Sequence, residues 1–334
     1  FMRNKSILFS PVTLISLFYN FIGLVSLVVY VYMIFKLKAN FVYKYFAVIL
    51  ALCLVFLYHV FLNGFVESLI MYRFHWGFFA FYLFFKGCSQ KYNITPLFLV
   101  MIVMIFLEVF AVNFFINVVD LPNYPLSNTA SQYISGIYSY GGNASITSVL
   151  LISILPIIEV GAVLYFSSFL AIFFIGSGSG LFLFILYSLF SKINMRKISI
   201  YMISFIFIAY LESIYESSIF YKISFDYFNI ILDIKINKIL NILSTMSWVE
   251  IFFGAHNAHK IVGGDAAWLN FFFSSGIVGV SIMAFLLLSN INKFNAFSIF
   301  IIFIGTFHYY VLFSLPGQLI TGYILTVGSK YESV

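Results

Sequence analysis

Long runs of apolar residues constrain this chain more than any other feature of its sequence. The candidate runs are Ser6–Phe35, Phe41–Leu62, Val66–Phe85, Pro96–Val119, Ala144–Phe190, Ile198–Phe220, Ala266–Leu288 and Phe294–Val327. A helix that crosses a bilayer needs about 20 apolar residues. Only 8% of the 334 residues are charged, whereas soluble domains carry about 25%. The sequence therefore predicts an all-α polytopic membrane protein, with residues 1–334 as a single polytopic membrane domain.

Two of these runs are too long for a single span. Pro156 and Gly161, followed by "GSGSG" at 176–180, divide the run 144–190 into three short spans. Pro316–Gly317 break the last run into a helix and a segment that we expect to be re-entrant. The first run is longer than the apolar core of a signal peptide, so we expect it to remain as an anchor. The runs together predict about 10–11 transmembrane helices.

Basic clusters orient the spans, because cytoplasmic loops concentrate Lys and Arg. We place "KINMRK" (192–197) and "KGCSQK" (86–91) in the cytoplasm, which puts the loops 120–143 and 221–264 outside. In the second loop, apolar residues recur at helical spacing along 226–243, which predicts an amphipathic helix on the membrane surface. A lid over a site is the alternative for that helix. The topology of the first run stays open, as a bent hairpin or as an exception to the charge rule.

In this topology, titratable residues from distant parts of the chain fall at the outer membrane face. They are Arg73, His75, His256, His259, Lys260, Asp265 and His308. Burying an ionisable side chain at membrane depth costs free energy unless it pairs with another group or lines a wet cavity. The alternative for each single residue is that its side chain only extends towards the membrane interface. Arginine binds phosphate oxygens bidentately, and histidine exchanges a proton near neutral pH. The cluster therefore predicts a water-accessible site for a diphosphate.

Several other chemistries lack the residues that they require. His256 and His259, even with Asp265, do not supply a complete metal site with its supporting shell, so we expect neither metal nor cofactor. "GSGSG" has no Lys-Ser or Lys-Thr after it, which favours a helix break or close helix packing over a phosphate loop. No basic face for nucleic acid is evident. The aromatic residues near the cluster, interpreted as interfacial anchors with sugar stacking as the alternative, are Trp76, Trp248, Trp268, Tyr309 and Tyr310.

The order and spacing of several stretches resemble the bacterial O-antigen and capsular polysaccharide polymerases and ligases. The stretches are "GGNASITSVLLISILP" (141–156), "IFFIGSGSGLFLFILYSLF" (172–190), "HNAHKIVGGDAAWLNFFFSSGIVGV" (256–280) and "FHYYVLFSLPGQLITGYIL" (307–325). The third is similar to the family's His-Asn or Gly-Asp segment before a span that ends in Gly-Ile-x-Gly. The fourth is similar to its His-Tyr…Ser-x-Pro-Gly ending.

The resemblance implies a membrane fold like that of the GT-C superfamily, in the bacterial inner membrane, with the active site facing the periplasm. The loops 120–143 and 221–264 would then be periplasmic. The implied activity is an inverting, metal-independent glycosyl transfer that joins undecaprenyl-diphosphate-linked oligosaccharide repeat units, with lipid diphosphate as the leaving group. The implied partners are the lipid-linked donor and acceptor glycans, membrane lipids, a chain-length regulator and a flippase.

The resemblance also implies roles for the clustered residues. Arg73, His75, His259 and Lys260 would bind the diphosphate, since the loop 120–143 has no basic residue. The catalytic residues would be His256, Asp265 and His308. A lipid-linked glycan flippase or transporter and an O-antigen ligase remain alternatives, with a membrane O-acyltransferase third. A flippase should show an internal repeat with paired broken helices, which the sequence does not reveal.

Overall fold

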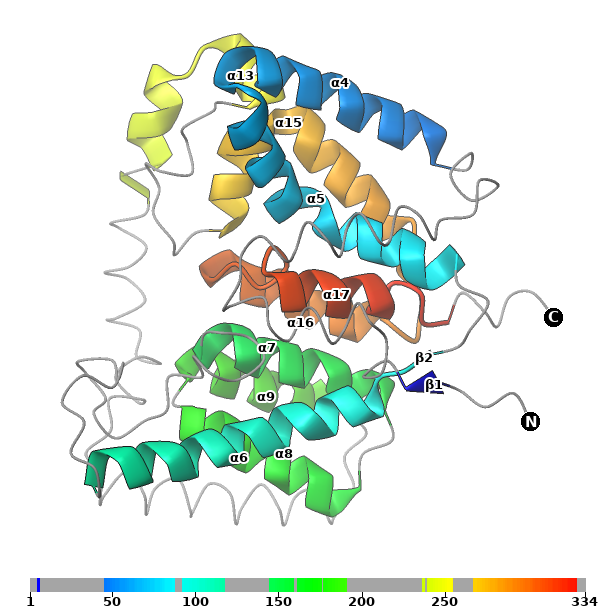
Figure 1. The fold of residues 1–334 in the computed structure, drawn as a ribbon. Helices are drawn as coiled ribbons and strands as arrows, with labels where there is room; N and C mark the ends of the chain where they lie inside the picture. The colour runs from blue at the N-terminus through cyan, green and yellow to red at the C-terminus, as the bar shows by residue number, and fades with distance from the viewer. Residues whose placement is uncertain are drawn as a thin grey trace. The chain divides into compact units, whose positions relative to one another are not determined.

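The computed structural model of the protein is mostly helical (Figure 1). It describes residues 5–6, 45–87, 92–117, 144–158, 161–175, 177–190, 236–237, 239–254 and 267–328. The helices are α4 (Phe46–Asn63), α5 (Phe65–Gly87), α6 (Thr95–Asn117), α7 (Ala144–Ile154), the 3-10 helix η2 (Leu155–Ile157), α8 (Ala162–Ile175), α9 (Gly178–Phe190), α13 (Trp248–Phe253), α15 (Ala267–Leu288), α16 (Ala296–His308) and α17 (Leu315–Ile324). Two-residue strands, β1 (Lys5–Ser6) and β2 (Tyr92–Asn93), pair in parallel.

The chain forms two compact units. The first contains Phe1–Asn93 and Leu232–Val334, and the second contains Ile94–Ile231. In the first unit, α5 packs against α4 and α17, while α15 packs against α13 and α16. In the second unit, α6 packs against α7 and α8, and α9 packs against the same two helices. All of the candidate site residues with described side chains belong to the first unit.

A close helix crossing forms the centre of the first unit. A Cβ added at Gly322 of α17 would lie 2.5 Å from Phe81 Cβ and 2.7 Å from Tyr82 N on α5. Glycine is therefore required for the two backbones to approach this closely. Pro316 lies in the first turn of α17, where its missing N–H costs no helical hydrogen bond. Nearly all of α17 is buried, although its 10 residues make it only about 15 Å long.

α15 contains a break in its middle. Gly276 has φ 62° and ψ −171° inside the helix, a conformation that essentially only glycine adopts. The chain at the end of α13 fills the space at this break. A Cβ at Gly276 would lie 2.4 Å from Phe252 O, and a Cβ at Gly254 would lie 2.1 Å from Ser274 O. Two backbones therefore touch where α15 is interrupted.

The second unit confirms the helix breaks predicted within 144–190. α7 ends before Pro156, α8 begins after Gly161, and α9 begins within "GSGSG". Ser177 Oγ accepts a hydrogen bond from Gly180 N at 3.1 Å. A Cβ at Gly180 would lie 2.5 Å from Ser148 Cβ of α7, so the small residues provide both a helix start and close packing. The resulting helices have 11 to 14 residues and are shorter than a full span of about 20.

The predicted runs and the observed helices agree closely in the described residues. The runs 41–62, 66–85, 96–119 and 266–288 correspond to α4, α5, α6 and α15. The last run divides into α16 and α17, as predicted. The sequence did not predict the β1–β2 pairing, because two residues carry no periodic pattern. The runs 6–35 and 198–220 and the loop 120–143 lie outside the described residues.

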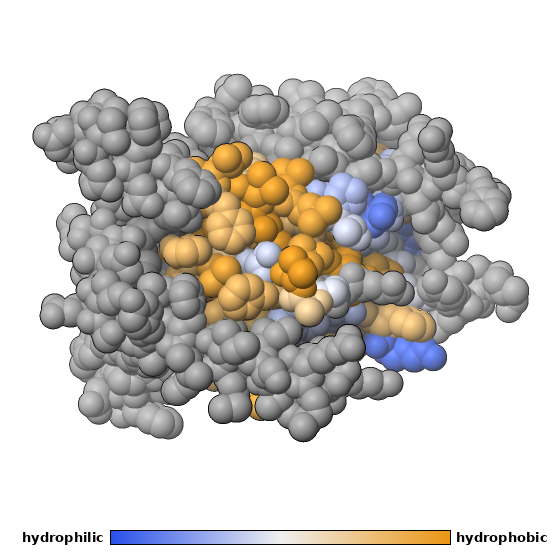
Figure 2. Space-filling view, turned by 90° about the horizontal axis from the view of Figure 1, so that it is seen from below, coloured by the Kyte–Doolittle hydropathy of each residue, from blue (hydrophilic) through white to orange (hydrophobic). Residues whose placement is uncertain are grey.

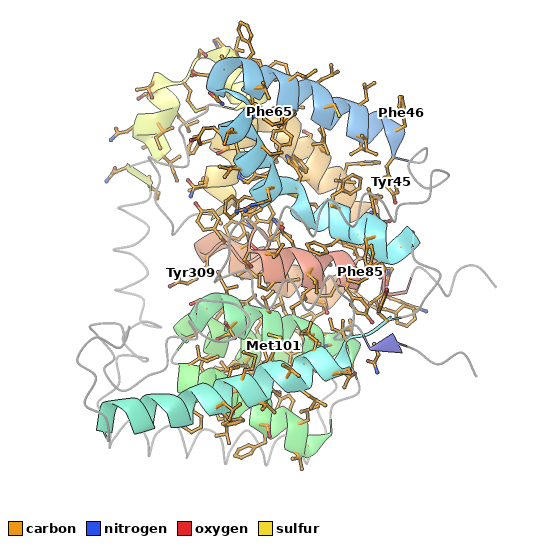
Figure 3. The ribbon with its side chains drawn as sticks, in the orientation of Figure 1. Tyr45, Phe46, Phe65, Phe85, Met101 and Tyr309 are labelled. Carbon is orange, nitrogen blue, oxygen red and sulfur yellow. The ribbon has the colours of Figure 1, made fainter. Side chains whose placement is uncertain are left out.

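The surface exposes many large apolar side chains. Phe61 on α4 is 89% exposed, and Leu288 on α15 is 70% exposed. Side chains point outward along α4, with Phe46 at its start (Figure 3). The described residues on the face seen in Figure 2 are mostly hydrophobic. Two helices, α4 and α15, are long and apolar enough to cross a membrane by length and composition.

Candidate functional site

His75 is buried in the middle of the first unit. It lies on α5, between the ends marked by Phe65 and Phe85 in Figure 3, and is 5% exposed. Its Nδ1 lies 3.3 Å from Ser275 Oγ of α15. The ring packs edge-on against Phe271 at 5.1 Å and against Phe313 at 5.4 Å between centroids. Side chains from two other segments, α15 and the turn before α17, therefore fix the position of the imidazole.

Arg73 lies on a different side of α5. Residues two positions apart on a helix do not face each other, and Arg73 is half-buried rather than buried like His75. Its guanidinium carbon lies 4.5 Å from the centre of the Phe74 ring. The fold therefore brings both predicted residues onto one helix, on different sides of its axis.

Hydrogen bonds from amide and indole side chains hold the helices around His75 together. Gln318 of α17 is 2% exposed. Its Nε2 donates to Arg73 O at 2.9 Å and Phe74 O at 2.7 Å. Asn270 of α15 donates through Nδ2 to the Tyr310 hydroxyl. Trp268 donates through Nε1 to Phe303 O of α16 at 2.9 Å. Together these bonds connect the segment that carries His75 with α17, and α15 with the end of α16.

The described residues on either side of the segment 255–266 lie near the contacts of His75. Before the segment, the Gly254 backbone touches Ser274 and Ser275. Ser275 is also the residue that contacts His75. After it, Ala267 begins α15 one helical turn before Phe271, which packs on His75. The described chain before and after the segment 255–266 therefore contacts residues that touch this imidazole.

The remaining predicted site residues belong to that segment or to the end of α16. His256, His259, Lys260 and Asp265 lie outside the described residues, so their roles stay predictions. His308 is the last residue of α16, and its side chain also lies outside the description. Its neighbour Tyr310 nevertheless bonds Asn270, which places the end of α16 beside α15.

His75 lies near the middle of α5, and its position relative to a membrane face stays a prediction. We expected it at the outer start of the third apolar run. It lies about ten residues after Phe65, or about 15 Å along the helix axis. Since α5 has 23 residues, His75 is nearer to the middle of the helix than to its end. Trp76 also differs from its interpretation as an interfacial anchor, because it is 8% exposed and packs on Phe271.

Sequence reasoning missed several of the residues that build this site. Ser275, Gln318 and Asn270 are uncharged, so a search for titratable groups passes over them. Their signal is polarity inside an apolar run: buried polar side chains in such a setting need hydrogen-bond partners. The pair Ser274–Ser275 followed by Gly276 also indicates a place where a helix can break.

The arrangement suits proton exchange and polar recognition more than metal binding. A serine hydroxyl at Nδ1 can fix the tautomer of an imidazole and so decide which nitrogen carries its proton. Among the described residues, no group of three His, Cys, Asp or Glu side chains could hold a metal ion. Comparisons with protein families, with curated proteins and with solved structures return no match for this chain.

Proposed function

We propose that this chain is a polytopic glycosyltransferase of the bacterial inner membrane, with its active site facing the periplasm. It would join undecaprenyl-diphosphate-linked oligosaccharide repeat units, as in the O-antigen and capsular polysaccharide polymerases that it resembles. The acceptor hydroxyl would attack the anomeric carbon of the donor sugar with inversion. The bond to the lipid diphosphate would break, and lipid diphosphate would leave.

The observation that carries this proposal is the buried polar centre at His75. An imidazole and a serine hydroxyl are in contact there, and the buried carboxamide of Gln318 donates to the α5 backbone at Phe74, the residue before His75. Ionisable groups buried between apolar helices are functional candidates, because their desolvation must be offset. Gly254, which directly precedes the segment 255–266, touches Ser275 of this centre. That segment carries His256, His259, Lys260 and Asp265.

Each predicted residue has a chemical task in the proposed reaction. Arg73, His75, His259 and Lys260 would stabilise the negative charge that develops on the leaving diphosphate. His256, Asp265 and His308 would accept or orient the proton of the acceptor hydroxyl. No metal or cofactor is needed for either task.

The broken and buried helices support a membrane setting. Irregular backbone at membrane depth is tolerated where protein buries it or where it lines a wet cavity. The break at Gly276 is covered by residues 252–254, and the short helix α17 is buried. A re-entrant position for α17 agrees with its length, which is too short for a span.

A lipid-linked glycan flippase is the second candidate. The break in α15 favours it, because transporters bind substrates at discontinuous helices. Such transporters carry these helices in pairs, and among the helices with described interiors only α15 contains a non-helical residue. A ligase would use the same donor chemistry with a different acceptor.

A deletion strain discriminates among these functions. Loss of a polymerase leaves single repeat units on the lipopolysaccharide core or on the carrier lipid. Loss of a flippase leaves no surface glycan, and loss of a ligase leaves long polymer on the carrier lipid. The proposal expects single repeat units, and complementation by the wild-type chain should restore the ladder. Either of the other two phenotypes would reject it.

A further inference from the structure

We propose that His59 is a positioning residue that holds the end of α13, residues 253–254, against the break in α15 where Ser275 contacts His75. The consequence for activity rests on the glycosyl transfer proposed above. His59 lies on α4, an apolar helix, and is fully buried. A buried imidazole loses its hydration, so it is retained only where hydrogen bonds compensate.

The compensating bond is made with α13. His59 Nε2 lies 2.7 Å from Phe253 O. A carbonyl oxygen can only accept, so Nε2 carries a proton and donates it. Phe253 is the last residue of α13, and the final carbonyls of a helix have no partner within that helix. His59 therefore satisfies one of these carbonyls from a separate helix.

α13 is short but well fixed at both ends. Ser247 and Glu250 form a capping box at its start, and Gly254 N donates to Glu250 O at 2.8 Å at its end. Rings reinforce the contact with α4, since Tyr58 packs against Phe253 at 5.4 Å between centroids. The hydrogen bond from His59 thus acts on a defined helix end rather than on a loose loop.

A continuous series of contacts leads from His59 to His75. His59 holds Phe253, and the next residue, Gly254, touches the backbone of Ser274 and Ser275. Ser275 Oγ in turn contacts His75 Nδ1. Loosening Phe253 should therefore displace Gly254 and, through it, the serine that contacts His75.

Three substitutions separate the hydrogen bond from side-chain volume. The amide nitrogen of glutamine reaches the position of Nε2, whereas that of asparagine reaches only the position of Nδ1. His59→Gln should therefore keep the bond, while His59→Asn and His59→Leu should lose it. Tyr72→Phe is the matched control. The Tyr72 ring packs 5.9 Å from His59, but its buried hydroxyl has no hydrogen-bond partner within the described residues.

Hydrogen exchange of the full-length protein in nanodiscs, measured by mass spectrometry on peptides covering 247–254, tests the anchor directly. Leaving the Phe253 carbonyl without its donor should make exchange at least about 5-fold faster in His59→Leu and His59→Asn. His59→Gln and Tyr72→Phe should exchange like the wild type. Exchange in His59→Gln as fast as in His59→Leu, or no change in any variant, would overturn the anchor.

Complementation of the deletion strain tests the consequence for activity at equal protein levels. His59→Leu and His59→Asn should give shorter ladders, and His59→Gln should restore them. Faster exchange with a normal ladder in His59→Leu would overturn the positioning role. If the wild-type chain restores no polymer, the proposed function fails. The hydrogen bond from His59 to Phe253 is rejected separately, by hydrogen exchange in His59→Leu that is as slow as in the wild type.

Discussion

Gly276→Ala tests the helix break that holds Ser275 beside His75. Two costs apply at this position. The residue has φ 62° and ψ −171°, a conformation that costs about 1–3 kcal/mol for a residue with a Cβ. That Cβ would also lie 2.4 Å from Phe252 O and 2.6 Å from Gly254 N. Backbone atoms cannot rotate away as side chains can, so overpacking should add about 1–3 kcal/mol.

Gly64→Ala provides the matched control, because it carries the first cost alone. Gly64 has φ 82° and ψ 162°, but its Cβ would meet nothing within 4 Å. The two variants should therefore differ by about 1–3 kcal/mol. For domains of comparable size, 1 kcal/mol lowers Tm by about 2–4 °C.

Thermal unfolding of the purified variants in detergent, followed by size-exclusion fluorescence, measures this difference. Gly276→Ala should unfold at a Tm lower than that of Gly64→Ala by at least about 2 °C. It should also shorten the polymer ladder more at equal protein levels. Equal Tm values for the two variants would refute the close contact between residues 252–254 and the break in α15.

Further predictions concern the polar centre and the membrane. Ser275→Ala should shorten the ladder more than Ser274→Ala, because Ser275 contacts His75 whereas Ser274 Oγ has no hydrogen-bond partner in the described part of the chain; equal ladders would contradict this. Gln318→Leu should destabilise the purified protein by about 1–3 kcal/mol, since it removes the hydrogen bonds of a buried amide to the carbonyls of Arg73, Phe74 and Phe313. Thr321→Val, which removes a buried hydroxyl without a partner in the described region, should cost less in the same unfolding assay. A variant with Trp76 and Trp268 replaced by Phe would leave Trp248, which is 78% exposed, as its single tryptophan. Its fluorescence should be quenched most by lipids labelled near the headgroup. Quenching that is strongest at the bilayer centre would exclude an interfacial position for α13.

Most of the helices were predictable from the sequence because bilayer-length apolar runs leave few alternatives. α4, α5, α6 and α15 follow the runs closely, and Pro316 marks the division between α16 and α17. Each of these signals is local, since a run or a proline acts on its own segment. Of the predicted amphipathic helix 226–243, residues 236–237 and 239–243 are described, and Ile239 and Ile242 pack on Phe273 of α15.

The arrangement of the site was less predictable, because it depends on contacts between distant segments. The sequence singled out His75 for its charge but could not show that Ser275, 200 positions away, contacts it. It assigned no role to His59, although a carbonyl 194 positions away accepts its hydrogen bond. Neither contact could be predicted from the sequence, because each joins segments that lie far apart along the chain. Only the pairing of helices determines such contacts.

Reconstitution tests the central claim most directly. The purified protein in liposomes would be given an undecaprenyl-diphosphate-linked repeat unit, and polymer length and released undecaprenyl diphosphate would be measured together. The account predicts polymer with an inverted linkage and one lipid diphosphate released for each bond, with both products strongly reduced in His75→Ala. Unchanged lipid-linked repeat units with folded wild-type protein, or equal products from His75→Ala, would contradict it.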